Sequence, residues 1–321
     1  MNKFVLILLI ALVSCKLDMD QAMFQQFQKF IKKFQKKYNS VNEFLARYEV
    51  FKRNVMDLFS EKASYSIGIS QFADLTRQEF TKKYLNFNYD AFALANLNPY
   101  QIEVSNAAPA AFDWRKKGAV APVSDQGAQF SSSILVSLDN LQSLYYIKKG
   151  KLINFSRQMV LDCVKNTQII DNIFKWFKEN GIETSSDYPD SGGIGTCKAD
   201  PSKYIDMAVT GLKRLNSPVD EEEMKEFLYE TAPLIVGLNA TPLQTYTGGI
   251  IDKTSSQCPS SGINHVGLLV GYGHDDATDK DYWTVKNSWG KSWGEDGYFR
   301  IKRGSGTCGI NTYVLTGTVA F

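Results

Sequence analysis

The N-terminal part of the chain carries apolar side chains at helical spacing. They recur every three or four residues, which places them on one face of a helix, and the first stripe comprises Phe24, Phe27, Phe30, Ile31, Phe34 and Tyr38. A second helical stretch follows in the same register, with Phe51 and Leu58 on one face and charged residues on the other. From residue 84 to residue 108 the periodicity is weak, which predicts a linker.

Helical spacing returns after the linker. One helical face is formed by Ile134, Leu135, Leu138, Leu141 and Tyr145. We expect this helix to end near Gly150, because glycine favours the left-handed conformation that closes a helix. Ser156 is placed to cap a short helix that reaches Cys163. Further helices are predicted over residues 173–179 and from residue 221 to residue 229.

Short β-rich runs bounded by glycine occupy the last part of the chain, at residues 266–270, 282–285 and 298–301. Helices followed by strands predict an α+β fold, with a helical lobe first and a β-rich lobe second. A length of 321 residues corresponds to about two folding units. With 44% hydrophobic and 22% charged residues the chain is neither disordered nor collagenous. A net charge of +2 provides no strong field for nucleic acid.

The first 15 residues have the pattern of a signal peptide. One lysine precedes an apolar run over residues 4–13, which is shorter than the roughly 20 residues needed to span a bilayer. No other stretch approaches transmembrane length. We therefore expect entry into the secretory route and a secreted or lysosomal (vacuolar) location, where disulfides form. The segment ending at Cys15 also resembles a bacterial lipoprotein box, which we favour less because the rest of the chain looks eukaryotic.

The cysteine count supports this interpretation. The chain has five cysteines, an odd number for a secreted protein. Cleavage near residues 14–16 would remove Cys15 and leave four, which allow three pairings.

Three short motifs carry candidate chemistry. They are Asn264-His265-Val266-Gly267, Lys286-Asn287-Ser288-Trp289-Gly290, and Asp125-Gln126-Gly127 ahead of the helix that begins after Ser131. In this order and spacing they resemble the papain-like cysteine peptidases, and nearly the whole chain resembles a cathepsin L-like precursor.

The N-terminal part contributes to the resemblance. The residues Glu43, Arg47, Phe51, Asn54 and Leu58 are similar to a motif of the family's inhibitory propeptide, and Gly68, Phe72 and Asp74 to a second motif, in which Ser70 stands where asparagine is usual. Residues 112–115 are similar to the start of the mature enzyme. The resemblance implies a signal peptide over residues 1–15, a helical inhibitory propeptide over 16–106, and a papain-like domain of two lobes over 107–321.

The resemblance also implies roles for particular positions. A cysteine at a helix N-terminus attacks the peptide carbonyl after a histidine draws off its proton. By motif, His265 is that base, Asn287 orients it, Gln126 stabilises the oxyanion, and Trp289 shields the hydrogen bond between His265 and Asn287.

The nucleophile position departs from the family pattern. The signature Gln-Gly-x-Cys-Gly-Ser-Cys-Trp aligns with residues 126–133, which puts Ser132 at the position of the catalytic cysteine. His265 follows Ser132 by 133 residues, within the usual interval of about 130–150, so the alignment has not slipped. A hydroxyl does not ionise against imidazole as a thiol does.

The neighbours of Ser132 differ from the family as well. Phe130 replaces a glycine beside the nucleophile, and we expect its ring to obstruct substrate. Ser133 replaces a large aromatic residue, and Gln129 replaces a cysteine of a disulfide across the cleft wall. Residues 164–171 lack both the partner cysteine and the glycines that bind extended substrate. The two bridges that the resemblance retains pair Cys163 with Cys197 and Cys258 with Cys308.

Other candidate sites are weaker. Asn154 and Asn239 begin glycosylation sequons. His274 lies in a polar turn beside two aspartates, which is more typical of a solvated loop than of a metal site. We expect no metal and no cofactor, and the sequence leaves the oligomeric state open.

The preferred hypothesis is a papain-family homologue that is catalytically inactive and binds peptides or proteins in its altered cleft, with its own propeptide as a further partner. The alternative is an active hydrolase, an endopeptidase that uses Ser132, His265 and Asn287. A third hypothesis is a structural role, because silicateins resemble cathepsin L, carry serine at the nucleophile position and serve in mineral deposition.

Overall fold

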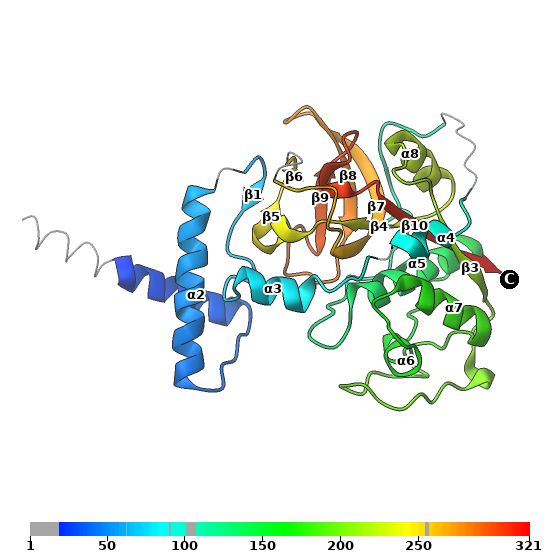
Figure 1. Cartoon of the computed structure of the whole chain (residues 1–321), viewed down its shortest axis with the longest axis horizontal. Coiled ribbons are helices and arrows are strands. Elements are labelled where there is room, and N and C mark those ends of the chain that lie inside the picture. Colours follow the sequence, from blue (N-terminus) through cyan, green and yellow to red (C-terminus); the bar gives the residue numbers. More distant parts are fainter. Residues whose placement is uncertain (1–18, 62, 90, 101–106, 254–256) are drawn as a thin grey trace, which may run out of the picture.

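The computed structural model describes residues 19–321 except 62, 90, 101–106 and 254–256. The expected signal peptide and the expected junction near residue 106 lie outside these residues. An N-terminal segment (residues 19–100) packs along two lobes, one rich in strands and one in helices (Figure 1). Among the described residues, no helix is both long and apolar enough to cross a membrane.

The N-terminal segment is built around two crossing helices. The first covers residues 19–33 and the second is α2 (Val41–Ser60). Ser40 caps α2 by accepting a hydrogen bond from the Glu43 amide. The predicted first helix ends sooner than its apolar stripe, because the chain turns after residue 33, yet Phe34 still packs on Phe30 with ring centroids 5.3 Å apart.

The rest of the N-terminal segment runs across the lobes. β1 (Ser66–Ile67) pairs with β5 (Tyr246–Gly248) of the β-rich lobe. α3 (Arg77–Tyr84) follows, with a capping box formed by Thr76 and Glu79. The predicted linker after Tyr84 is only partly unstructured: it contains α4 (Ala91–Asn96), and its Leu85 and Phe87 are buried.

The helices predicted after residue 106 are confirmed. α5 (Ser132–Lys149) ends at Gly150 in the left-handed conformation, and α6 (Arg157–Cys163) is capped by Ser156. α7 (Ile170–Asn180) begins three residues before the prediction, and α8 (Glu221–Glu230) begins at the expected glutamates. Disulfides join Cys163 to Cys197 and Cys258 to Cys308.

An eight-stranded sheet forms the β-rich lobe and contains all three predicted strands. The order is β3-β10-β4-β7-β8-β9-β6, and β2 pairs with β7 beside this path. The pairs are antiparallel except for β6 with β9. The bounds are β2 (Phe112–Asp113), β3 (Ala208–Arg214), β4 (Leu234–Leu238), β6 (Ile250–Ile251), β7 (His265–Asp275), β8 (Lys280–Lys286), β9 (Tyr298–Lys302) and β10 (Tyr313–Ala320), with 3₁₀ turns at η1 (Pro201–Lys203), η2 (Thr241–Thr245) and η3 (Thr307–Gly309).

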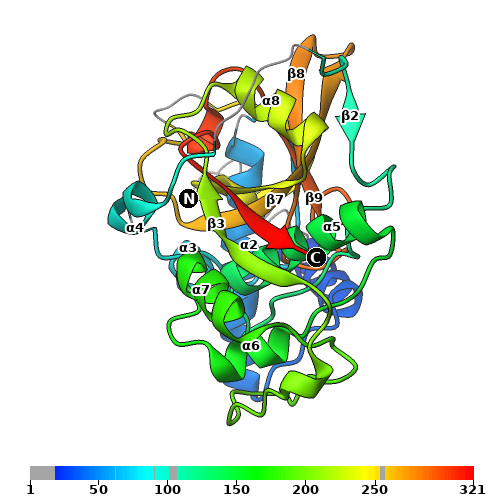
Figure 2. The ribbon, with the colours of Figure 1, turned by 90° about the vertical axis from the view of Figure 1, so that its right-hand side faces the viewer.

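The central helix α5 joins the two lobes. It packs on β4, β7 and β10 as well as on α6 and α7 (Figure 2). Its buried Asn140 donates to the Pro233 carbonyl (2.9 Å) and accepts from the Gly317 amide (2.8 Å). Because these partners belong to the sheet, the N-terminus of α5 is held at a fixed place beside β7 and β8.

The aromatic core of the N-terminal segment supplies a test of its packing. Phe51 of α2 is fully buried, with its ring centroid 5.1 Å from that of Phe27. Changing Phe51 to alanine leaves a cavity that costs about 3–5 kcal/mol. We expect faster cleavage of the N-terminal segment by an added protease. The matched control is Phe59→Ala on the same helix, since Phe59 is 84% exposed and its loss should not change the rate. Equal rates for the two variants would contradict this packing.

Candidate active site

The predicted site residues come from three places in the fold. Ser132 is the first residue of α5, His265 is the first residue of β7, and Asn287 follows β8. Gln126 lies in the loop before α5. All four are buried in the described structure.

His265 and Asn287 form a direct hydrogen bond. The distance from His265 Nε2 to Asn287 Oδ1 is 2.8 Å. The Ser288 amide also donates to Asn287 Oδ1, at 2.8 Å, which fixes the orientation of the Asn287 side chain. Because Oδ1 can only accept, Nε2 carries the proton in the neutral ring and Nδ1 is left as an acceptor.

Trp289 covers this pair from one side. Its ring is fully buried, and its centroid lies 4.8 Å from that of the His265 ring. The indole thus excludes water from the hydrogen bond between His265 and Asn287.

Burial makes His265 a weak base in this state. It lowers the pKa of His265 to about 4, although the hydrogen bond that His265 donates to Asn287 and the nearby Tyr84 backbone act in the opposite direction. The ring is therefore neutral at pH 7.

Ser132 is not connected to His265. Among the described residues, neither Ser132 Oγ nor His265 Nδ1 has a hydrogen-bond partner, and both atoms are buried. The two buried groups therefore lack the contact through which a base removes a hydroxyl proton.

Gln126 presents an uncommitted donor. Its backbone amide donates to the Ser288 carbonyl (2.8 Å), and its Oε1 accepts from Ser288 Oγ (2.6 Å). Its Nε2 is buried and has no partner within the described part of the chain. Such an N–H can stabilise a developing oxyanion or bind a carbonyl oxygen.

The N-terminal segment covers the site. Phe72 and Phe80 place their rings 5.2 Å and 5.4 Å from Trp289, centroid to centroid. The Phe87 amide donates to the Asn264 carbonyl at 3.3 Å, and Gln71 Nε2 donates to the Trp289 carbonyl at 2.9 Å. These contacts place residues 71–87 over the site and explain why it is buried.

The wall beside Ser132 is held by side-chain contacts. The Phe130 ring is only 7% exposed, and Cζ of Arg157 lies 4.3 Å from its centroid. That this ring obstructs substrate stays a prediction. Ser133 Oγ donates to the Gln168 carbonyl at 3.1 Å, and Gln129 Nε2 donates to the Gly192 carbonyl. Hydrogen bonds thus hold two segments of this wall.

The other predicted sites lie apart from this centre. The Asn154 side chain is exposed, and Asn239 is half-buried with its Oδ1 accepting from the Thr241 amide. His274 is exposed and faces Asp281, with 3.0 Å between Nδ1 and Oδ1. Over the described ranges, no group of three or more histidine, cysteine, aspartate or glutamate side chains is arranged to hold a metal ion.

Sequence reasoning missed Arg157 and the buried ion pair between Lys286 and Asp139, whose Nζ and Oδ1 are 2.7 Å apart. Nothing in the sequence pointed to Arg157, because a single arginine at the start of a helix is typical of a solvent-exposed residue. Lys286 could have been noticed, since it directly follows the apolar run of residues 282–285 and precedes Asn287.

Together, a histidine held by an asparagine, a helix N-terminus and a glutamine donor define a cleft of the thiol peptidase type between two lobes. The description "Papain family cysteine protease" matches residues 108–318, and "Cathepsin propeptide inhibitor domain" matches residues 27–80. The chain belongs to the papain family of cysteine proteases, with a cathepsin-type propeptide ahead of the papain fold.

Similar proteins cover most of the chain. Cysteine proteinase 1 of Dictyostelium discoideum is 33% identical over 92% of this chain and 92% of its own length. Cysteine proteinase 15A of Pisum sativum is 33% identical over 90% of this chain and 85% of its own. Digestive procathepsin L 3 of Tenebrio molitor larval midgut superposes with a TM-score of 0.80 at 30% identity, over 92% of this chain and 99% of that structure.

The lowered pKa of His265 predicts a pH-dependent stability. Unfolding returns this pKa from about 4 to near 6.5, so between these values the unfolded chain binds a proton that the folded chain does not. The stabilisation is complete above pH 6.5 and is lost as the pH falls toward 4. From pH 7 to pH 5, wild type should lose about 2 kcal/mol more unfolding free energy than His265→Gln.

Denaturant unfolding of the full chain at both pH values measures this difference. His274→Gln is the control: Asp281 raises the pKa of exposed His274, so its removal should shift the pH dependence in the opposite direction. The same pH dependence in wild type and His265→Gln would contradict the buried, neutral imidazole.

Proposed function

We propose that this chain is a papain-family homologue that does not hydrolyse peptides and binds extended peptide segments in its cleft. Ser132 stands at the nucleophile position in this proposal, and the cysteine of the family is replaced. The observation that carries the proposal is the missing hydrogen bond between Ser132 Oγ and His265 Nδ1, since neither atom has a partner in the described structure.

The chemistry of serine makes this contact decisive. A cysteine thiolate is stable beside an imidazolium and needs no proton transfer at the moment of attack. A serine hydroxyl stays protonated, so its base must be in contact when it attacks the carbonyl. His265 lacks that contact here, and a pKa of about 4 makes it a poor acceptor in the covered state.

The hydrogen bonds of the cleft wall favour a role in binding peptides over a role in cleaving them. The Gln168 carbonyl, in the shortened segment after α6, is committed to Ser133 Oγ. What remains for a ligand is the uncommitted Gln126 Nε2 and the Asn264 carbonyl, which the Phe87 amide occupies in the precursor. An extended backbone flanked by apolar side chains fits these groups, and the backbone of Phe87 already meets the Asn264 carbonyl in this way.

Secretion is part of the proposal. Residues 1–15 direct the chain into the secretory route, residues 16–106 are the propeptide, and the product is secreted or delivered to a lysosome or vacuole. Two disulfides in the described structure agree with an oxidising route. Glycosylation at Asn154 and Asn239 stays a prediction.

The direct test compares wild type with Ser132→Ala after an added protease has removed the propeptide. Both should cleave a panel of fluorogenic peptides no faster than buffer does. A labelled peptide copying residues 77–89 should bind both forms saturably, measured by fluorescence anisotropy, and mass spectrometry should recover it intact. Hydrolysis by wild type that Ser132→Ala abolishes would overturn the proposal.

The second candidate is a serine-dependent endopeptidase. The intact hydrogen bond between His265 and Asn287 and the free Gln126 donor favour it, because both are needed for catalysis. It predicts that a fluorophosphonate probe labels wild type at Ser132 once the propeptide is gone, and not Ser132→Ala. Absence of labelling in a chain that still binds the peptide would exclude it.

A further inference from the structure

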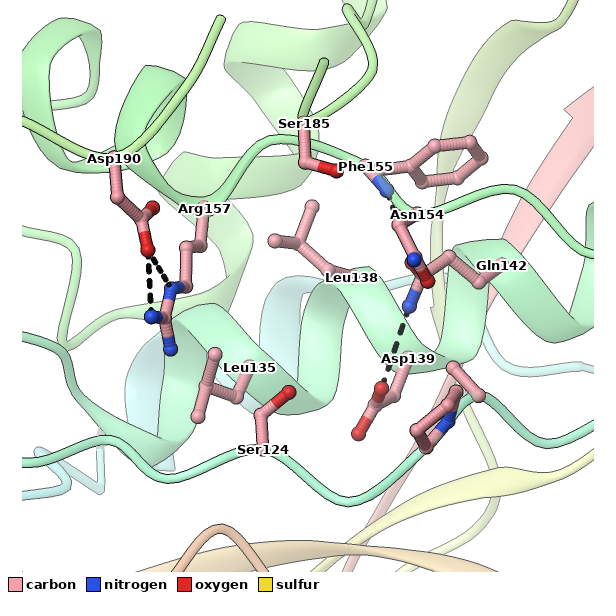
Figure 3. A pocket seen from close by; sticks show the side chains of 12 residues that line it. Ser124, Leu135, Leu138, Asp139, Gln142, Asn154, Phe155, Arg157, Ser185 and Asp190 are labelled. Carbon is pink, nitrogen blue, oxygen red and sulfur yellow. Dashed lines mark hydrogen bonds and ion pairs between the residues drawn. The ribbon is translucent and has the colours of Figure 1, made fainter. Parts of the chain in front are cut away.

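A second cavity lies outside the cleft, behind the N-terminal half of α5. Its volume is about 320 Å³, within the range of small-molecule pockets. It is enclosed by α5, the segment around Ser124, the start of α6 and the loop that contains Asp190 (Figure 3). Ser132, His265, Asn287 and Gln126 do not line it, although Arg157, which does, also packs on Phe130 of the wall beside Ser132.

The cavity has an apolar floor with an ionic group at each end. Leu135 and Leu138 of α5 lie between the two ends, and both are buried. Figure 3 shows Arg157 on one side of these leucines and Asp139 on the other.

Arg157 has donors to spare. Its Nε and Nη2 donate to Asp190 Oδ2 at 2.9 Å and 2.6 Å, and its Nη1 donates to the Asp125 carbonyl at 3.1 Å. A guanidinium has five N–H groups. Two of these N–H groups, one on each terminal nitrogen, therefore donate to no residue that the structure describes. A second carboxylate can accept hydrogen bonds from both.

Asp139 has an acceptor to spare. Its Oδ1 accepts from Lys286 Nζ at 2.7 Å and from Gln142 Nε2 at 3.3 Å. Its Oδ2 accepts no hydrogen bond from any residue that the structure describes. An ammonium group can donate to that oxygen.

The charges around the cavity already balance. Lys286 compensates Asp139, and Asp190 compensates Arg157. A simple cation or anion would therefore bring an uncompensated charge into a half-enclosed site, which is costly. A zwitterion brings none, and it offers an anionic group for Arg157 and a cationic group for Asp139.

We propose that this cavity binds a zwitterion with an apolar side chain, either a free α-amino acid or a dipeptide. The ammonium donates to Asp139 Oδ2, the carboxylate accepts from Arg157, and the side chain lies on Leu135 and Leu138. The hydroxyls of Ser124 and Ser185 line the same space and can bond to either end.

Isothermal titration of the full chain tests the ligand class. Leucine or the dipeptide leucyl-leucine should bind saturably, and comparison of the two identifies the source. N-acetylleucine lacks the ammonium and leucinamide lacks the carboxylate, so each should bind at least about tenfold more weakly, as expected for loss of one charge-assisted hydrogen bond. No binding of either zwitterion, or equal binding of the blocked analogues, would overturn the proposal.

Variants test the site. Arg157→Gln should weaken binding of the zwitterion about tenfold or more and leave leucinamide unaffected. The matched control is Arg115→Gln, which removes another arginine paired with an aspartate, Asp113, away from the cavity.

Asp139→Asn should weaken binding from the ammonium end of the cavity. This change deprives Lys286 of its buried partner, so thermal unfolding must show that the variant is folded. Ser185→Leu places a bulky side chain at an exposed position of the cavity lining and should block entry of the ligand. Undiminished leucine binding by Arg157→Gln and by Ser185→Leu would contradict the assignment.

Discussion

The buried hydrogen bond between His265 Nε2 and Asn287 Oδ1 is the interaction on which the candidate site depends. Antiparallel pairing of β7 with β8 brings the two residues together, and Trp289 removes water from their contact. The bond fixes the tautomer, so Nδ1 is the only basic atom that can face Ser132. All later chemistry depends on what bonds to that atom, and in the described structure it has no hydrogen-bond partner.

The lobes are joined by polar contacts in the interior. Asn140 of α5 bonds to backbone groups of the sheet, and Asp139 pairs with Lys286, the residue before Asn287. A buried ion pair gains little stability, because desolvation offsets the attraction. Its directional contacts instead set the position of α5, and hence of Ser132, relative to His265 and Asn287.

The sequence predicted helix ends well where a single residue type, such as a capping serine or a terminal glycine, has one known effect on the backbone. Gly150 ends α5 and Ser156 caps α6, as expected from capping chemistry. The helix α4 was missed, because six residues are too few for a periodic signal. The motifs identified the histidine, asparagine and glutamine, since their spacing is a property of the family.

Tertiary contacts were beyond sequence reasoning. The burial of Phe130 depends on Arg157, which is 27 residues away in the chain. The commitment of the Gln168 carbonyl depends on how a shortened segment folds back onto α5. The cavity behind α5 combines residues from four segments, and the one motif among them, the sequon at Asn154, does not predict a cavity.

We propose that this cleft has been rebuilt to hold peptides, so that its lack of hydrolysis does not rest on a single atom. The variant Ser132→Cys, freed of its propeptide, separates a rebuilt cleft from one that lacks only a thiol. Alkylation by iodoacetamide, followed by mass spectrometry, first establishes that the new thiol is reachable. The account predicts that this variant cleaves peptides no faster than Ser132→Ala. Recovery of peptide turnover by the single change would contradict it, because the cleft would then have lacked only its thiol.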